Sequence, residues 1–195
     1  MSSEYKIWLH KVEKKACDVV RLIGFDEGYR LARGESLKAD WPSEAYFNMN
    51  VDRPENALLM DALFNISSLV IVSKHLRNFL LEWEIAGLEL LPVGLKDHSG
   101  ELIEDPYYVL NLASHFDCLD SAKSSAKKSL VPGKYSSVEK LVLKNLDLTK
   151  SSKLFRLKNY GIPTIVSNDL AAAIDDAGFT GVRWGELKDY SGDSW

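Results

Sequence analysis

The sequence lacks the segments that carry a chain into or across a membrane. No apolar run approaches the ~20 residues that a bilayer-spanning helix needs, although 46% of the chain is hydrophobic. The first eight residues, MSSEYKIW, are not a basic segment followed by an apolar one, so no secretory signal peptide is expected. These absences predict a cytoplasmic protein without a membrane partner.

Cysteine is scarce, and the short motifs of metal and nucleotide chemistry are missing. Cys17 and Cys118 are the two cysteines, too few for a disulfide framework. The four histidines form no H-E-x-x-H pattern, and the glycines form neither G-x-G-x-x-G nor a phosphate loop. Ser73 and Ser167 lack the G-x-S-x-G surroundings of a hydrolase nucleophile. We therefore expect no cofactor, no metal site and no enzymatic activity.

The alternative hypothesis is an enzyme, and its candidate site is a polar cluster between residues 111 and 120. It contains a cysteine and a histidine, which can act as a thiol nucleophile and its base. The cluster comprises Asn111, His115, Asp117, Cys118 and Asp120. On a strand, residues three apart point to opposite faces, whereas on a helical turn His115 and Cys118 could meet. An enzyme site here competes with the simpler interpretation, in which these polar side chains satisfy turns and caps.

Charge is unevenly distributed, although the net charge is only −4. Residues 82–120 contain nine carboxylates and one lysine, a difference of −8. Residues 123–158 contain ten basic and two acidic residues, a difference of +8. The basic segment has no clustered arginines, so nucleic-acid binding is not expected. Two interpretations follow: adjacent segments neutralise each other on the folded surface, or an acidic face meets a basic protein partner.

One sequence pattern occurs twice, at residues 69–91 and 164–184. Each copy begins with a β-branched run, VIV at 70–72 and TIV at 164–166, followed by a serine at the N-cap position of a helix. Apolar residues at helical spacing, a glycine stop and a second apolar run complete each copy. The pattern predicts two strand–helix–strand units in an α+β fold with a mixed β-sheet.

The remaining segments are less regular. We predict a helix after Pro54 with Leu58 and Leu63 in its apolar stripe, and a short strand or sheet edge at 46–51. Residues 114–137, rich in lysine and serine, predict an irregular surface excursion. A boundary near residues 50–55 would separate an N-terminal strand and loop region, 1–52, from an α+β domain, 53–195. One continuous domain is the alternative.

Several phrases along the chain together resemble one protein family. They are YYVLNL at 107–112, DCLD at 117–120, KS at 123–124, LFRL at 154–157, IVSNDL at 165–170 and AGFTGVRW at 177–184. In this order they are similar to the immunity proteins of bacterial polymorphic toxin systems. The group in question is the myxobacterial-type one, first described as a domain of unknown function. The resemblance covers residues 69–186.

The resemblance implies a small cytoplasmic protein that binds a cognate toxin one to one and neutralises it by occlusion, without catalytic residues of its own. A cytosolic adaptor or regulatory binding module is the alternative. Charge and expected exposure, rather than the resemblance, suggest the contacts. These are Asp97, Glu101, Glu104 and Asp105 in a turn-rich loop, and Glu186, Asp189, Tyr190, Asp193 and Trp195 in the tail. A homodimer through Trp195 or the strand at 46–51 is left open.

Overall fold

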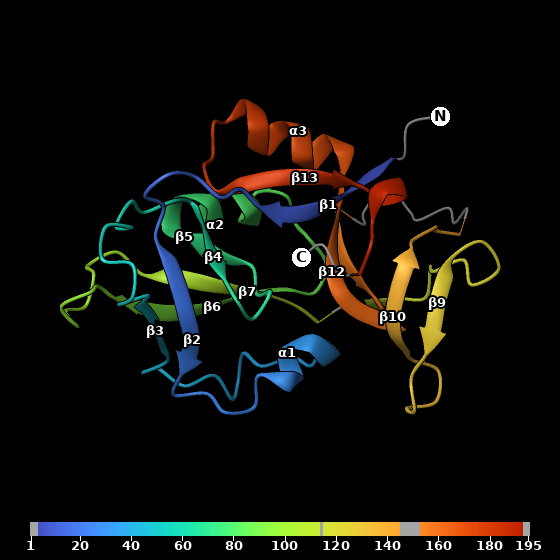
Figure 1. Cartoon of the computed structure of the whole chain (residues 1–195), viewed down its shortest axis with the longest axis horizontal. Helices are drawn as coiled ribbons and strands as arrows, with labels where there is room; N and C mark the ends of the chain where they lie inside the picture. Colours follow the sequence, from blue (N-terminus) through green and yellow to red (C-terminus); the bar gives the residue numbers. More distant parts are fainter. Residues whose placement is uncertain (1–3, 114, 145–152, 193–195) are drawn as a thin grey trace.

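The strands of this protein form three assemblies. The computed structural model describes residues 4–113, 115–144 and 153–192. Within them lie a closed six-stranded barrel, a five-stranded sheet and a two-stranded hairpin (Figure 1). Helices α2 (Lys74–Leu81) and α3 (Asn168–Asp176) lie on one side of the barrel and the sheet. In this described part of the chain, no helix is long and apolar enough to cross a membrane.

The barrel is built from the N-terminal and central parts of the chain. Its strands are β2 (Asp18–Ile23), β3 (Tyr46–Met49), β4 (Ala62–Asn65), β5 (Ile71–Ser73), β6 (Leu88–Lys96) and β7 (Tyr107–Leu112). They follow one another around the ring in the order β2-β3-β6-β7-β5-β4. Helix α1 (Tyr29–Arg33) lies in the connection between β2 and β3. Alternate side chains of a strand face opposite sides, so one set fills the interior, including Phe47, Ile71 and Val109.

The five-stranded sheet takes strands from both ends of the chain. They are β1 (Tyr5–His10), β8 (His115–Phe116), β11 (Leu154–Leu157), β12 (Tyr160–Ser167) and β13 (Val182–Glu186), in the order β13-β1-β12-β11-β8. Residues 5–49 therefore contribute to both assemblies, since β1 belongs to this sheet and β2 and β3 belong to the barrel. The proposed domain boundary at residues 52 and 53 falls in the turns after β3.

Both predicted strand–helix–strand units are present. The first consists of β5, α2 and β6, and the second of β12, α3 and β13. In each unit the two strands are separated by a third, because β7 lies between β5 and β6 and β1 lies between β12 and β13. Each inserted strand is antiparallel to both neighbours. The two outer strands are thus parallel, as expected when a helical crossover connects them.

The two units also resemble each other in one additional strand, which precedes each unit in the sequence. β4 precedes β5 and pairs with it in antiparallel fashion, and β11 does the same with β12. The strand order is therefore β4-β5-β7-β6 in the barrel and β11-β12-β1-β13 in the sheet. The central strand comes from the following segment in the first unit and from the N-terminus in the second. The repeated sequence pattern thus corresponds to a repeated topology.

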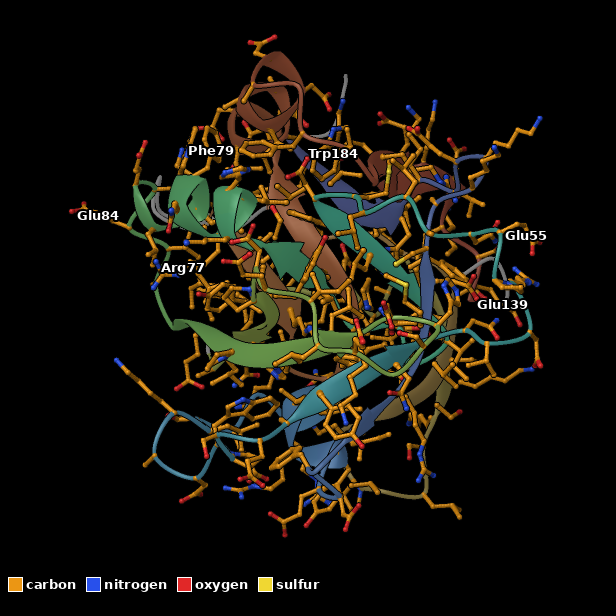
Figure 2. The ribbon with its side chains drawn as sticks, turned by 90° about the vertical axis from the view of Figure 1, so that its left-hand side faces the viewer. Glu55, Arg77, Phe79, Glu84, Glu139 and Trp184 are labelled. Atoms are coloured by element: carbon orange, nitrogen blue, oxygen red, sulfur yellow. The ribbon has the colours of Figure 1, made fainter. Side chains whose placement is uncertain are left out.

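The two helices pack into one shared core. The buried residues of this core include Leu76, Leu80, Leu170, Ala171 and Ile174 from the two helices. The ring of Phe79 lies 5.1 Å from that of Phe179, centroid to centroid, in an edge-on arrangement. Figure 2 shows Phe79 of α2 and Trp184 of β13 on the side where the two helices approach each other. Burial of the two apolar helix faces holds the repeated units together.

Only one of the two predicted serine caps forms. The Ser73 hydroxyl oxygen accepts a hydrogen bond from the backbone N–H of Leu76 at 3.2 Å. Ser167 stands at the N-cap of α3, but its hydroxyl donates to the Asp169 carboxylate instead. That carboxylate accepts from the Leu170 N–H at 2.9 Å. An acidic residue in the first turn supplies the negative charge that a helix N-terminus favours.

One expectation about the first half of the chain is wrong, and two others are met only in part. The α+β class is roughly consistent with the structure, and both parallel and antiparallel strand pairs are present. The strands nevertheless divide into a barrel and a separate sheet, because the two repeated units pack helix to helix and do not share strands. No helix follows Pro54: the segment consists of turns and then β4, and Leu58 stays half exposed. The strand predicted in this region is present at 46–49, but it is not an edge, because it pairs with both β2 and β6.

The segment 114–137, predicted to be irregular, contributes to an ordered hairpin. Its strands are β9 (Ser125–Lys128) and β10 (Tyr135–Lys140), which pair in antiparallel fashion. Val138 of β10 is fully buried and belongs to an apolar cluster with Leu141 and Phe155. Residues 138–143 were predicted as a strand, but the strands at 125–137 were not, because only their face toward the body is apolar, while the other face is solvated.

Candidate functional site

The acidic residues predicted in the loop after β6 lie at the surface, but two of them serve the fold itself. The Asp97 carboxylate accepts hydrogen bonds from the Ser99 N–H at 2.8 Å and the Glu101 N–H at 3.0 Å. Hydrogen bonding, chiefly from the Ser99 hydroxyl, lowers the pKa of Asp97. A carboxylate oxygen of Asp105 lies 3.9 Å from the Lys74 Nζ. The two remaining carboxylates of this acidic loop, residues 97–105, are those of Glu101 and Glu104, both exposed.

The acidic residues of the tail lie elsewhere. Glu186 is exposed on β13, and Asp189 is exposed in the short helix η1 (Leu187–Asp189). Figure 1 places η1 and the acidic loop toward opposite ends of the long axis of the molecule. The fold therefore does not bring the two acidic groups together into one surface.

One residue of the tail, Tyr190, is less exposed than predicted. Tyr190 is only 2% exposed, and its hydroxyl donates to the Tyr160 hydroxyl at 3.0 Å. Tyr190 is therefore not exposed as predicted, because the segment after β13 packs back against β1 and β10. Asp193 and Trp195 lie outside the described residues.

The polar cluster at 111–120 is dispersed between the core and the surface. Asn111 and Cys118 are fully buried, whereas Asp117 is exposed and lies 3.1 Å from the Lys144 Nζ. Asp120 accepts hydrogen bonds from the turn that follows it. Burial, with the Arg156 and Lys134 charges, lowers the pKa of His115 to about 4. Burial raises the pKa of Cys118 to about 11. A thiol that stays protonated at neutral pH does not favour nucleophilic chemistry.

This burial predicts slow thiol modification. Burial also raises the pKa of Cys17, to about 12, so both cysteines are protonated and inaccessible in the folded protein. We expect iodoacetamide at about pH 8 to leave the native protein unlabelled and to modify both cysteines after unfolding in guanidinium. Mass spectrometry measures the label. Rapid modification of native Cys118 alone would contradict the prediction and support the enzyme hypothesis.

Asn111 fastens a loop to the barrel. Its side-chain amide donates to the Glu35 backbone carbonyl and to the Glu89 carboxylate, at 2.8 Å each. The same carboxylate accepts from the Leu37 N–H at 2.9 Å and from the Ser36 hydroxyl. Burial would raise the pKa of Glu89, but these hydrogen bonds outweigh it and lower the pKa. The arrangement explains Asn111 as a structural residue.

The lowered pKa of Glu89 predicts a pH-dependent variant. Since the folded protein favours the charged form, this stability is present above the ordinary carboxyl pKa of 4.5 and is lost as the pH falls through the folded value. We expect Glu89→Gln to lower the free energy of unfolding by ~1 kcal/mol at neutral pH, a modest value because the group is partly solvated. Denaturant titrations of both proteins would measure the difference. A difference that persists unchanged in acid would contradict the assignment.

A groove of about 370 Å³ lies where the barrel meets the five-stranded sheet. Its walls come from β1, from β4 and the loop after it, from β12 and from Arg183 of β13. Backbone hydrogen bonds fix the two assemblies at this seam: Ala62 N–H donates to the Thr180 carbonyl at 3.0 Å, and Lys11 N–H donates to the Gly181 carbonyl at 2.9 Å. The groove therefore has a rigid frame.

Exposed apolar side chains surround this groove. Val12 is 77% exposed, Ile66 75%, Ile162 51% and Phe64 37%, and all four line the groove. They come from three separate parts of the chain, which the fold brings together. Scattered exposed apolar residues are ordinary, but a contiguous group around a hollow is typical of a binding surface.

Two unpaired ring nitrogens accompany the apolar lining. Trp8 Nε1 and His10 Nδ1 are buried and have no hydrogen-bond partner among the described residues. Burial lowers the pKa of His10, a hydrogen bond to the Leu69 backbone opposes the shift, and the Arg183 charge adds to it. The imidazole is therefore neutral at physiological pH. A neutral ring bonded through one nitrogen leaves the other as an acceptor, while an indole N–H is a donor.

Sequence reasoning missed the groove. Val12 and Ile66 are single apolar residues in loops, and Ile162 lies near the start of a strand whose other residues are mostly buried. An apolar residue flanked by polar loop residues is the signal that could have identified the first two. Their convergence depends on the packing of β4 against β1, which no local pattern encodes.

Comparison with known protein families identifies the chain. The model of an immunity protein family, Imm11, matches residues 10–189 of the 195-residue chain. The matched region contains the complete barrel, the hairpin, helices α1, α2 and α3 and most of the groove lining, but not Ile7, Trp8, Leu9 and Tyr190. No curated protein matches the chain.

Proposed function

The chain belongs to the Imm11 immunity protein family, and from this membership we propose that it protects a bacterial cell by binding a cognate toxin of a polymorphic toxin system. The protein acts in the cytoplasm, where it forms a one-to-one complex and covers the active surface of the toxin. It catalyses no reaction. The observation that carries the proposal is the family match across residues 10–189.

The groove supports a binding role and is the proposed contact surface. Its rim combines the exposed apolar side chains of Ile66, Ile162 and Val12 with the cationic Arg183. Protein interfaces have an apolar centre and a polar rim, and a few well-packed apolar or aromatic side chains dominate their affinity. An apolar side chain of the toxin would occupy the groove and contact this exposed apolar rim.

The acidic loop is the competing location for this contact. Glu101 and Glu104 are exposed there, and carboxylates at an interface act mainly on the association rate. This proposal requires a toxin with a basic surface. It predicts that reversing both charges slows association and weakens its salt dependence, without a change in groove contacts.

Coexpression with the neighbouring genes tests the function. The tagged protein is produced beside each adjacent reading frame, and cell growth and copurification are scored in parallel. We expect one gene product to stop growth when expressed alone, and growth to recover when this protein forms a stable complex with it. A catalytically inactive toxin variant serves as the control for copurification without toxicity.

Other outcomes separate the remaining hypotheses. Growth recovery without a complex would replace the proposal with an enzyme that reverses the damage, and would redirect attention to residues 111–120. Neither recovery nor a complex with any neighbouring product would favour an adaptor or regulatory module.

A further inference from the structure

A basic hairpin, here residues 123–144, extends from the body of the molecule beside η1 (Figure 1). Its base is well anchored. The Ser124 hydroxyl donates to the Val142 carbonyl at 3.2 Å and accepts from the Val142 N–H at 3.0 Å. Val138 is fully buried in the apolar cluster that also contains Leu141. The hairpin is therefore held in a fixed position relative to the sheet.

The tip of the hairpin presents two apolar side chains to water. Leu130 is 103% exposed and Val131 58%. The turn that carries them is closed by hydrogen bonds from the Ser129 N–H to the Lys134 carbonyl at 2.9 Å and from the Lys134 N–H to the Val131 carbonyl at 3.1 Å. A preformed turn fixes the backbone that carries these side chains before binding, which lowers the entropy cost of a contact.

The hairpin and the residues that adjoin its base together have an excess of positive charge. Residues 115–144 with Lys158 contain seven lysines and three carboxylates, which gives a net charge of +4. Each carboxylate neutralises one lysine: Asp120 pairs with Lys123, Glu139 with Lys127 and Asp117 with Lys144. In the described chain, no carboxylate pairs with the other four, which are Lys128, Lys134, Lys140 and Lys158.

We propose that this hairpin is a second contact element for the toxin, and that it fits an acidic surface of the toxin with an apolar pocket for Leu130. The inference rests on the proposed immunity function and specifies the chemistry of the partner. Lysines of the hairpin attract the acidic surface and accelerate encounter. The apolar tip then enters the pocket and slows dissociation.

The composition of the hairpin favours a protein partner over a nucleic acid or a lipid surface. Residues 123–144 contain no arginine, the residue most used for bidentate phosphate and base contacts. The tip has aliphatic residues and no aromatic one, whereas single-stranded nucleic acids stack on aromatic rings. Membrane-surface segments combine basic residues with a larger apolar face that includes Trp or Phe.

The hairpin adjoins the groove, so one partner can reach both. Tyr190 lines the groove and follows η1, which contacts β10 of the hairpin. Gly192 lies against the Val138 carbonyl of the same strand. A toxin seated in the groove can therefore extend toward the hairpin, which lies away from the acidic loop at the other end of the molecule (Figure 1).

Three variants of the full chain test the inference against the product of the neighbouring toxin gene. Leu130→Ala removes the apolar tip, and the pair Lys128→Glu and Lys140→Glu reverses two unpaired charges. The pair Glu101→Lys and Glu104→Lys in the acidic loop is the matched control. All these residues are exposed, so thermal unfolding of the free variants is expected to stay unchanged. Surface plasmon resonance gives association and dissociation rates at two salt concentrations.

The tip variant is expected to dissociate about 30-fold faster, the effect of losing one strong apolar anchor. The lysine pair is expected to associate about tenfold more slowly at low salt, with a smaller difference at high salt. The control pair should leave both rates unchanged. Slower association of the acidic-loop pair, with normal rates for the hairpin variants, would overturn the inference and assign attraction to the acidic loop.

The outcomes separate this inference from the function on which it rests. If the unmodified protein binds and neutralises the toxin but all hairpin variants do so equally well, the inference fails and the immunity function stands. If the unmodified protein binds no toxin, the function itself fails. Short single-stranded DNA and phosphatidylserine vesicles are parallel probes, and lysine-dependent binding to either with unaltered toxin binding would also overturn the inference.

Discussion

Replacing Ile66 and Ile162 by aspartate is expected to abolish protection against the toxin. The two side chains are 75% and 51% exposed, and both line the groove. Two charges placed in the apolar centre of an interface would remain desolvated and unpaired in the complex. We expect the dissociation constant to rise about 100-fold or more, since loss of one strong apolar contact alone costs about 2 kcal/mol and 1.4 kcal/mol is tenfold.

Calorimetric titration with the toxin and growth in coexpressing cells measure this effect. Val51→Asp is the matched control, because Val51 is 65% exposed and lies in the turn after β3, outside the groove. Both proteins should unfold at the native temperature, as surface substitutions change stability by only ~0.5 kcal/mol. Full protection by the double variant would show that the groove is not the contact surface.

The Gly181→Ala substitution is expected to destabilise the protein strongly. Gly181 has a φ of +79°, and a Cβ there would lie 2.1 Å from the Ala62 carbonyl oxygen. That oxygen is backbone of β4, so relief requires the barrel to move away from β13. We expect a loss of about 4 kcal/mol, from the strained backbone and the clash together.

The Gly178→Ala variant separates the effect of the strained backbone from the effect of the clash. Gly178 has a similar φ of +75°, but a Cβ there meets no atom within 4 Å. This variant should therefore lose only the ~1 kcal/mol of the left-handed conformation. Denaturant unfolding of both variants measures the difference. Equal losses would mean that the seam between β4 and β13 can open without cost, which would also weaken the case for a rigid groove.

The seam at Gly181 explains why part of the site was beyond sequence reasoning. Thr180 and Asp61 lie 119 positions apart, yet the Asp61 carboxylate accepts from the Thr180 N–H at 3.0 Å and hydroxyl at 2.8 Å. In the sequence they are an ordinary turn threonine and an isolated aspartate. Contacts of this kind depend on the packing of the two repeated units, to which no local pattern refers.

Among the predicted contact residues, sequence reasoning gave the correct exposure for several acidic ones but not for Tyr190. Glu101, Glu104, Glu186 and Asp189 are exposed, as turn-rich acidic segments indicate. Tyr190 is buried because the segment after β13 returns to the body and forms a hydrogen bond with Tyr160. A terminal aromatic residue looks the same in sequence whether it docks or faces a partner. Its burial depends on a cavity formed by strands distant in the chain.

The sequence by itself determined the local units. Both strand–helix–strand units were indicated by the spacing of apolar residues, the β-branched runs, the Ser73 cap and the glycine stops. These signals are local, since strands and caps depend on residues within a few positions. The family resemblance also depended on sequence order alone. Tertiary structure decided the rest: the barrel, the insertion of β7 and β1 into the two units, the ordered hairpin and the groove. These features arise because apolar faces from distant segments must be buried together, and the choice of partner face is a property of the complete chain.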